Sequence, residues 1–177
     1  MNAYSVQGNI LINGEGVARL ADFGIFRIIT DPSVVASGSA TTAKKGLVRY
    51  MAPEQIDPLQ FNQENSNPSK KSDVYSLVMT AYEVRFPSSP VGRLRTSCYS
   101  QVLTGVKPYA DKREGDITIL VTAGTRPPRP TDEAVDPLPD LIWETMESCW
   151  SQDLSSRLSI SEMHRAFLRS VGNVNGK

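Results

Sequence analysis

Two short apolar runs near the N-terminus predict a β-hairpin. Residues 9–12 and 17–20 are separated by the polar sequence Asn-Gly-Glu-Gly at residues 13–16. Asn and Gly accept the positive φ that a tight turn requires. Residues 1–7, which precede the first run, show no apolar period. We therefore expect a strand, a turn and a second strand as the first ordered elements.

Four later segments have the apolar spacing or the end signals of helices. The first helix begins at Lys70, and its apolar residues recur at i, i+3, i+4, i+7 and i+8. The next follows Asp116 and ends at Gly124, a residue type common just after a helix end. A third spans the apolar positions of 142–150, and the last opens with a Ser-x-x-Glu capping box at 159–162. The predicted inward-facing residues are Val74, Leu77, Val78, Ala81 and Tyr82; Ile142, Met146, Cys149 and Trp150; and Ile160, Met163 and Phe167.

Composition narrows the class of function. The 177 residues are 40% hydrophobic, enough for one globular domain with a core, and the formal net charge is zero. A neutral chain has no electrostatic reason to bind nucleic acid or an anionic membrane surface. No apolar run approaches the length of a membrane span. We expect an intracellular, cytoplasmic protein that binds neither nucleic acid nor membrane.

The metal-ligating and redox side chains are few. The only two cysteines, Cys98 and Cys149, are far apart and lack a C-x-x-C spacing, so neither a disulfide framework nor a zinc site is predicted. The single histidine, His164, excludes sites built from several histidines and is expected to be a solvated or packing side chain on the last helix.

The most specific pattern lies between the hairpin and the first long helix. Asp22-Phe23-Gly24 follows the second strand, and Ala52-Pro53-Glu54 comes about thirty residues later. An isolated Asp at a strand end would more often cap the next turn. The two triplets in this order resemble the activation segment of eukaryotic protein kinases.

This resemblance extends over residues 8–170 and implies the catalytic, C-terminal lobe of a kinase. The fold it implies is mainly α, with the short β-hairpin near the N-terminus and the small lobe absent. Arg-Pro-Pro-Arg-Pro at 126–130 and Cys149-Trp150 are similar to phrases of the tyrosine-kinase-like group of serine/threonine kinases. Residues 1–7 match nothing in the family, and 171–177 form a tail.

The family resemblance implies roles for individual residues. Asn9 and Asp22 match the ligands of the Mg²⁺ ions that bridge the phosphates of ATP. Both side chains offer the oxygen atoms that Mg²⁺ prefers. The structural residues implied by the family are Phe23 and Gly24 beside the site, Asp73 as a brace, and Arg157 paired with Glu54 in a buried ion pair.

The sequence also departs from the family. Leu47 replaces the usual Thr after Gly46, and Tyr4 stands where the catalytic Asp is expected, five residues before Asn9. No His-Arg-Asp sequence and no Gly-rich loop are present. We therefore expect this chain alone to bind ATP and Mg²⁺ poorly and to be inactive.

Residues 84–101 interrupt the family pattern. Their removal joins Glu83 to Val102 and restores the family phrase Glu-Val-Leu-Thr-Gly. We interpret 84–101 as a short translated intron. The alternative is a docking loop that uses Arg85, Arg93 and Arg95.

The loop between the two triplets is rich in hydroxyl groups. These groups could accept phosphate and then pair with basic side chains, although each could equally be an unmodified part of a solvated loop. The candidate phosphorylation sites are Thr30, Ser33, Ser37, Ser39, Thr41 and Thr42.

Two functions follow from these patterns. The first is ATP-dependent phosphoryl transfer to Ser or Thr of protein substrates by the intact gene product. The alternative is a non-catalytic, pseudokinase-like module that binds kinases or their substrates. Because the helices that normally cover the first long helix are missing, we also expect an exposed apolar strip at Val74, Leu77 and Val78 that drives association.

Overall fold

The structure is a computed structural model, and it describes part of the chain. Side chains are described for residues 47–83, 107–130 and 138–169, and backbone elements also at 4–7, 10–12, 18–20 and 170–174. The chain divides into two compact units, Met1–Leu47 and Val48–Lys177.

The first unit contains a three-stranded antiparallel sheet in the order β1-β2-β3. Strand β2 (Ile10–Ile12) pairs with β3 (Ala18–Leu20), so the predicted hairpin is confirmed. Strand β1 (Tyr4–Gln7), which pairs with β2, was not predicted. The missed signal is the alternation of Tyr4 and Val6 with polar residues, which has the two-residue period of a strand.

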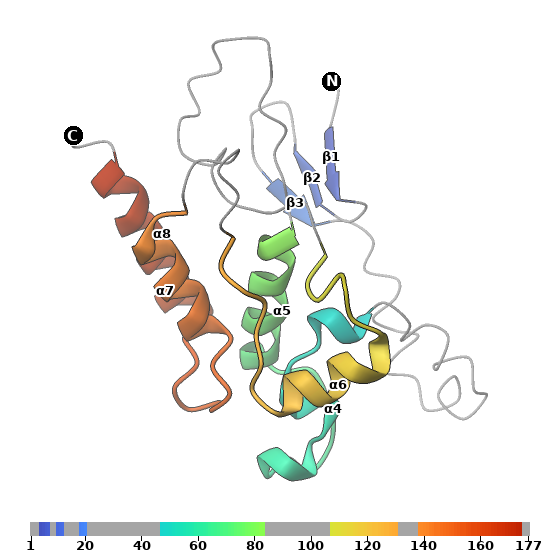
Figure 1. Cartoon of the computed structure of the whole chain (residues 1–177). Coiled ribbons are helices and arrows are strands. Elements are labelled where there is room, and N and C mark those ends of the chain that lie inside the picture. The colour runs from blue at the N-terminus through green and yellow to red at the C-terminus, as the bar shows by residue number, and fades with distance from the viewer. Residues whose placement is uncertain are drawn as a thin grey trace. The chain divides into compact units, whose positions relative to one another are not determined.

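The second unit is helical, so the predicted mainly α fold class is confirmed (Figure 1). Helix α5 packs against α7 and α8, while α4 contacts α6 and η2. The elements are η1 (Leu47–Tyr50), α4 (Pro53–Ile56), η2 (Leu59–Phe61), α5 (Lys70–Glu83), α6 (Glu114–Thr122), α7 (Asp140–Cys149) and α8 (Ile160–Val174).

Helix α5 is the centre of the core, but its buried face differs from the prediction. Tyr75 and Met79 are fully buried, whereas Leu77 is 40% exposed and Ala81 is only partly buried. Since residues 74–82 are apolar around most of the helix, their spacing alone could not select the face. The neighbouring helices decide it, and the buried apolar residues are Val74, Tyr75, Val78, Met79 and Tyr82.

The expected exposed strip on α5 is therefore wrong. Val74 and Val78 are each 1% exposed and belong to the main hydrophobic core, so of the three residues only Leu77 reaches solvent. The predicted face of α7 is confirmed, because Ile142, Met146 and the residues at 149–150 are buried.

Side-chain caps begin two of the helices. Ser159 and Glu162 form the predicted capping box at α8, each side chain accepting a hydrogen bond from the other residue's backbone N–H. At α5, Ser69 and Ser72 exchange the same pair of bonds. Ile160 was expected to face inward but is 50% exposed, because it is the first residue of α8 and precedes the buried Met163.

Helix α6 ends in a Schellman motif at the predicted glycine. Gly124 has φ +88°, its N–H donates to the Val121 carbonyl, and the Thr125 N–H donates to the Leu120 carbonyl. An added Cβ at Gly124 would meet only the Gln152 side chain, at 3.9 Å. Backbone conformation, rather than crowding, therefore requires glycine here.

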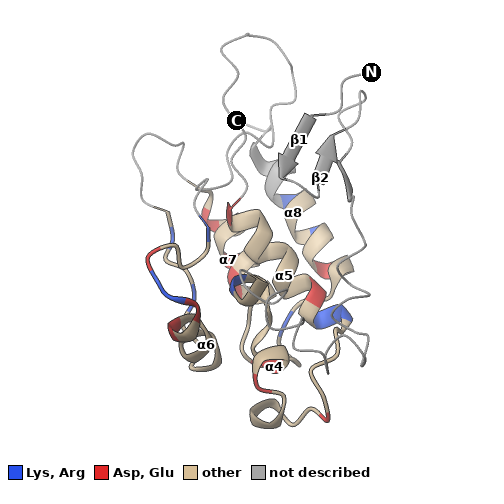
Figure 2. Cartoon of the chain, turned by 90° about the vertical axis from the view of Figure 1, so that its right-hand side faces the viewer, with Lys and Arg blue, Asp and Glu red and all other residues tan. Residues whose placement is uncertain are grey.

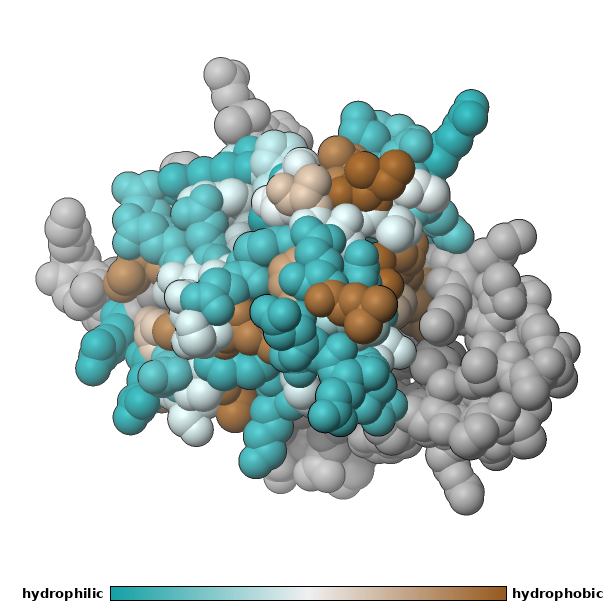
Figure 3. Space-filling view, turned by 90° about the horizontal axis from the view of Figure 1, so that it is seen from below, coloured by the Kyte–Doolittle hydropathy of each residue, from teal (hydrophilic) through white to brown (hydrophobic). Residues whose placement is uncertain are grey.

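The described surface carries charges of both signs. Figure 2 shows Lys and Arg interspersed with Asp and Glu along the described helices and loops. Figure 3 shows scattered apolar groups on the face seen from below; over the whole described surface, Leu59 and Ile119 are the most exposed large apolar residues. Within the described residues, no helix combines the length and apolarity needed to cross a bilayer.

We predict opposite effects of alanine at two glycines. Gly124→Ala should lower the free energy of unfolding by about 1–2 kcal/mol, because an L-residue is strained at positive φ. Gly115→Ala, within α6 and with open space around it, should raise that free energy by about 0.5 kcal/mol. Urea unfolding followed by tryptophan fluorescence measures both. Equal effects of the two substitutions would contradict the assigned C-cap.

Candidate functional site

The residues expected to hold Mg²⁺ lie outside the described part of the chain. This applies to Asn9 and Asp22, to Phe23 and Gly24, and to all six candidate phosphorylation sites in residues 30–42. The strands that flank the two expected ligands are described, and their register pairs Ile10 with Leu20.

Tyr4, which occupies the sequence position of the catalytic Asp, belongs to strand β1. Its backbone pairs with Ile12, at the other end of β2 from Ile10. Tyr4 is thus part of a sheet ladder rather than a loop that follows a helix.

The second triplet of the predicted activation segment is buried at the start of α4. Ala52, Pro53 and Glu54 are all buried. Pro53 is the first residue of α4, where its missing N–H costs nothing. The Gln55 side chain accepts a hydrogen bond from the Ala52 N–H at 3.2 Å, which fixes the entry of the chain into the helix.

Glu54 forms a buried, two-pronged ion pair with Arg157. The distances are 2.6 Å from Nη1 to Oε1 and 2.9 Å from Nη2 to Oε2. The side chains of Arg157 and Glu54 are 0% and 5% exposed. This geometry joins the end of the predicted activation segment to the loop before α8 by two parallel, charge-assisted hydrogen bonds.

The remaining donors of Arg157 bind backbone carbonyls. Its Nε and Nη2 donate to the Ser151 carbonyl, and its Nη1 also donates to the Lys71 carbonyl at 3.1 Å. Lys71 reciprocates, because its Nζ donates to the Arg157 carbonyl. The buried guanidinium thus has a carboxylate partner and neutral acceptors, as a buried charge requires.

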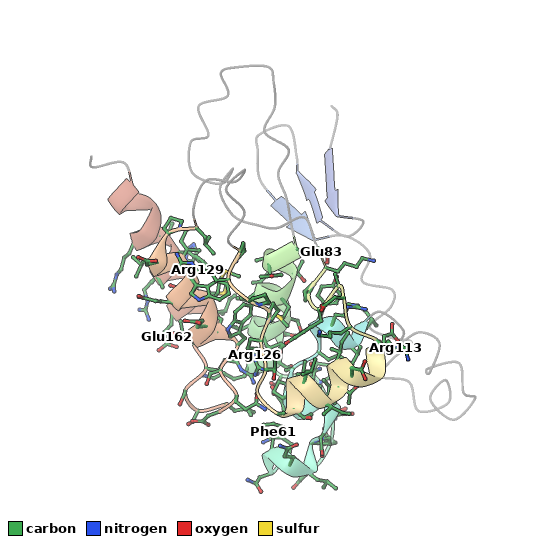
Figure 4. All side chains as sticks on the ribbon, viewed as in Figure 1. Phe61, Glu83, Arg113, Arg126, Arg129 and Glu162 are labelled. Atoms are coloured by element: carbon green, nitrogen blue, oxygen red, sulfur yellow. The ribbon has the colours of Figure 1, made fainter. Side chains whose placement is uncertain are left out.

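Tyr75 of α5 lies beside this ion pair. The guanidinium carbons of Arg126 and Arg157 lie over its ring, 5.1 and 5.3 Å from the centroid, within cation–π range. Burial raises the pKa of the Tyr75 hydroxyl. Arg126, labelled in Figure 4, also donates to the Trp150 carbonyl at 2.8 Å. Arg126 thus links the Tyr75 ring on α5 to the residue that follows α7.

The segment before Ala52 is held by α5. Ser76 Oγ donates to the Tyr50 carbonyl at 2.7 Å, and the Tyr50 hydroxyl donates to Glu83, the last residue of α5 (Figure 4). Burial and the hydrogen bond to the Glu83 carboxylate raise the pKa of Tyr50.

Asp73 lies on the first turn of α5 and is exposed. Its side chain forms no hydrogen bond or ion pair with any residue that the structure describes, so the expected brace is not seen within this part of the chain. His164 is exposed, so of the two alternatives it is the solvated side chain rather than a packing one. Cys149 is buried, and this burial raises the pKa of its thiol to about 12, which leaves it unreactive.

Sequence reasoning identified Glu54 and Arg157 but missed three residues that support them. Lys71, Tyr75 and Arg126 had no assigned role, although all three contact Arg157 or the ring beside it. No spacing rule brings together residues so far apart in the sequence. An aromatic residue within a helix and a cation after a helix end are each too common to be signals.

A family model described as protein tyrosine and serine/threonine kinase matches residues 6–167. The chain belongs to this protein kinase family. Similar proteins include TGF-beta receptor type-2 of Gallus gallus, 28% identical over 152 residues, which are 85% of this chain and 26% of the receptor. The similarity to this receptor thus covers most of this chain.

Two further relatives come from an animal and a plant. Ephrin type-A receptor 5 of Rattus norvegicus is 30% identical over 149 residues, 84% of this chain and 12% of the receptor. Serine/threonine-protein kinase STY17 of Arabidopsis thaliana is 28% identical over 169 residues, 93% of this chain and 23% of that kinase. The chain therefore spans about a quarter or less of the length of these relatives.

We predict that the kinase chain depends on the Glu54–Arg157 pair for stability. Glu54→Ala leaves a buried guanidinium without its counter-charge and should cost about 3–5 kcal/mol in the free energy of unfolding. Replacing both partners by Glu54→Leu and Arg157→Met should cost less than the single change, because no unpaired charge stays buried. Denaturant unfolding measures each value.

The Arg129–Asp140 pair provides the matched control. Its Asp140 side chain is 82% exposed, with an N–O distance of 2.7 Å. Asp140→Ala should therefore cost no more than about 1 kcal/mol. If Glu54→Ala lowers the free energy of unfolding by no more than Asp140→Ala does, the buried pair contributes no more to stability than the exposed one.

Proposed function

We propose that this chain is the C-terminal-lobe part of a tyrosine-kinase-like protein kinase that phosphorylates Ser or Thr of proteins with Mg²⁺ and ATP. The observation that carries the proposal is the buried Glu54–Arg157 pair. It ties the end of the predicted activation segment to the helical core, where a protein substrate would dock. Membership of the kinase family supports the same reading.

Asn9 and Asp22 are the proposed holders of the nucleotide's metal ions. An amide oxygen and a carboxylate are suitable hard ligands for Mg²⁺. The pairing of Ile10 with Leu20 supports this assignment, because it brings together the two strand ends to which Asn9 and Asp22 are attached. When bound, Mg²⁺ would neutralise phosphate charge.

The other proposed roles are supporting ones. Phe23 would pack behind the metal site, and Gly24 would permit the backbone turn there. Glu54 and Arg157 hold the substrate-docking end, while Asp73 would brace the catalytic loop. Phosphorylation of the hydroxyl-rich loop at residues 30–42 is proposed to order the segment by adding charge that basic side chains can bind.

We propose that this chain alone does not transfer phosphate. No Asp stands five residues before Asn9, since that position is Tyr4 in strand β1. A kinase also needs a Gly-rich loop and a strand Lys to hold ATP, and the sequence contains no Gly-rich loop. The active form would be a longer, intracellular product of the same gene.

A second candidate function is a pseudokinase-like module that binds other kinases or protein substrates. Tyr4 favours it, because a strand residue without a carboxylate cannot orient a substrate hydroxyl. This module would still use the docking surface around α4. It would not require the metal ligands Asn9 and Asp22.

We predict that the purified chain transfers no labelled phosphate from ATP to a generic protein substrate. A longer product that includes an upstream catalytic loop and small lobe should be active. Asp22→Asn in that product should lower the rate at least about a hundredfold, because a carboxylate that holds the metal is lost.

The Asp22→Asn variant also separates the outcomes. Transfer by the short chain that Asp22→Asn abolishes would disprove its inactivity, whereas transfer that persists would indicate a contaminating kinase. A longer product that is inactive but still binds protein partners, with binding unaffected by Asp22→Asn, would establish the interaction module instead.

For residues 84–101 we predict that mature transcripts omit the corresponding codons. A chain with 84–101 deleted should unfold at the same or a higher urea concentration, since a shorter loop costs less closure entropy. Transcripts that all retain the codons would overturn the intron hypothesis and leave the docking loop with Arg85, Arg93 and Arg95.

A further inference from the structure

Arg49 joins two segments that are far apart in the sequence. Its Nη1 donates to the carbonyls of Pro108, at 2.9 Å, and of Tyr109, and its Nη2 donates to the Lys112 carbonyl at 3.2 Å. All three acceptors belong to one turn, before α6. Among the described residues, Arg49 takes part in no ion pair.

The accepting turn is strained and anchored. Tyr109 has φ +54°, in the left-handed region that non-glycine residues rarely adopt. The Tyr109 hydroxyl donates to the Thr125 carbonyl at 2.8 Å, and the Lys112 N–H donates back to the Tyr109 carbonyl at 3.0 Å. Such a conformation persists only where surrounding contacts hold it in place. The hydrogen bonds from Arg49 to the carbonyls of this turn are among those contacts.

The segment that carries Arg49 is fixed from the other side by the core. Val48 and Tyr50 pack against it, and Ser76 binds the Tyr50 carbonyl. Residues 48–50 therefore contact α5 through Ser76 and the turn at 108–112 through Arg49. Arg49 makes the side-chain hydrogen bonds that reach the turn.

We propose that Arg49 is a positioning residue that makes residues 48–51 and the turn at 108–112 one structural unit. The inference rests on the proposed function in that this unit would form one wall of the substrate-docking surface. Since its donors already serve three carbonyls, Arg49 orients the wall and is not a phosphate ligand. The turn thereby helps to set the conformation of residues 48–51.

The planar fork of arginine explains why this residue type is needed. Arginine presents five N–H donors in a fixed arrangement, whereas lysine is a compact point charge on a flexible stem. Lysine at position 49 could bind one or two of the carbonyls but would not span the turn. The interaction should therefore depend on shape as well as on charge.

Hydrogen exchange of the whole chain tests the proposal through two reporter amides. The Lys112 N–H donates to the Tyr109 carbonyl within the turn, and the Met51 N–H donates to the Val48 carbonyl within residues 48–51. Arg49→Gln should make both amides exchange about tenfold faster, with Arg49→Lys intermediate. The Met163 amide in α8 is the internal reference and should be unchanged.

Two controls show whether the fork itself is responsible. Lys112→Gln removes a nearby positive charge but keeps the accepting carbonyl, so exchange should not change. Methylguanidinium added to Arg49→Ala should restore slow exchange, whereas methylammonium at the same concentration should not. An unchanged Lys112 amide in Arg49→Gln, or equal rescue by both cations, would overturn the proposal.

This test needs no kinase activity, so it can fail or succeed independently of the proposed function. If the exchange result holds but no longer product is active, Arg49 still organises the surface of an interaction module. If a longer product is active but the exchange is unchanged, the kinase assignment stands and the role of Arg49 does not.

Discussion

The buried pair of Glu54 and Arg157 is the interaction on which the described structure depends. Two charges are removed from water, and this is tolerable only because the carboxylate and carbonyl acceptors satisfy the guanidinium from several sides. The pair connects α4 to the loop before α8, and Tyr75 carries the connection into α5. A segment that would otherwise be a surface loop is thereby made part of the core.

This arrangement gives residues 48–54 two different kinds of support. The C-terminal end of this segment is fixed by a desolvated ion pair. Its middle is fixed by Arg49, which donates to the Pro108 and Lys112 carbonyls, and by Ser76, which donates to the Tyr50 carbonyl. Neither support uses the residues proposed to bind Mg²⁺ and ATP. The chain can thus keep the proposed docking surface ordered even if it transfers no phosphate, a property that both the kinase and the interaction-module proposals require.

The sequence predicted those features that depend on local chemistry. The pairing of β2 with β3, the capping box of Ser159 and Glu162, and the stop at Gly124 follow from neighbouring residues, and all are present. Motif resemblance identified the family and the partner of Glu54. The face of α5 and the contacts of Arg49 and Tyr75 could not be predicted, because they depend on which distant segments pack together. The expected exposure of Val74 and Val78 failed for this reason.

The most direct test of this account is the opening free energy of α4, measured by native-state hydrogen exchange at the Gln55 and Ile56 amides. Both amides donate to the Ala52 carbonyl. If the buried ion pair makes this short helix part of the core, the two amides will open with the same free energy as the Trp150 amide at the end of α7. Opening of α4 at a much lower free energy, as for an ordinary surface loop, would contradict the account.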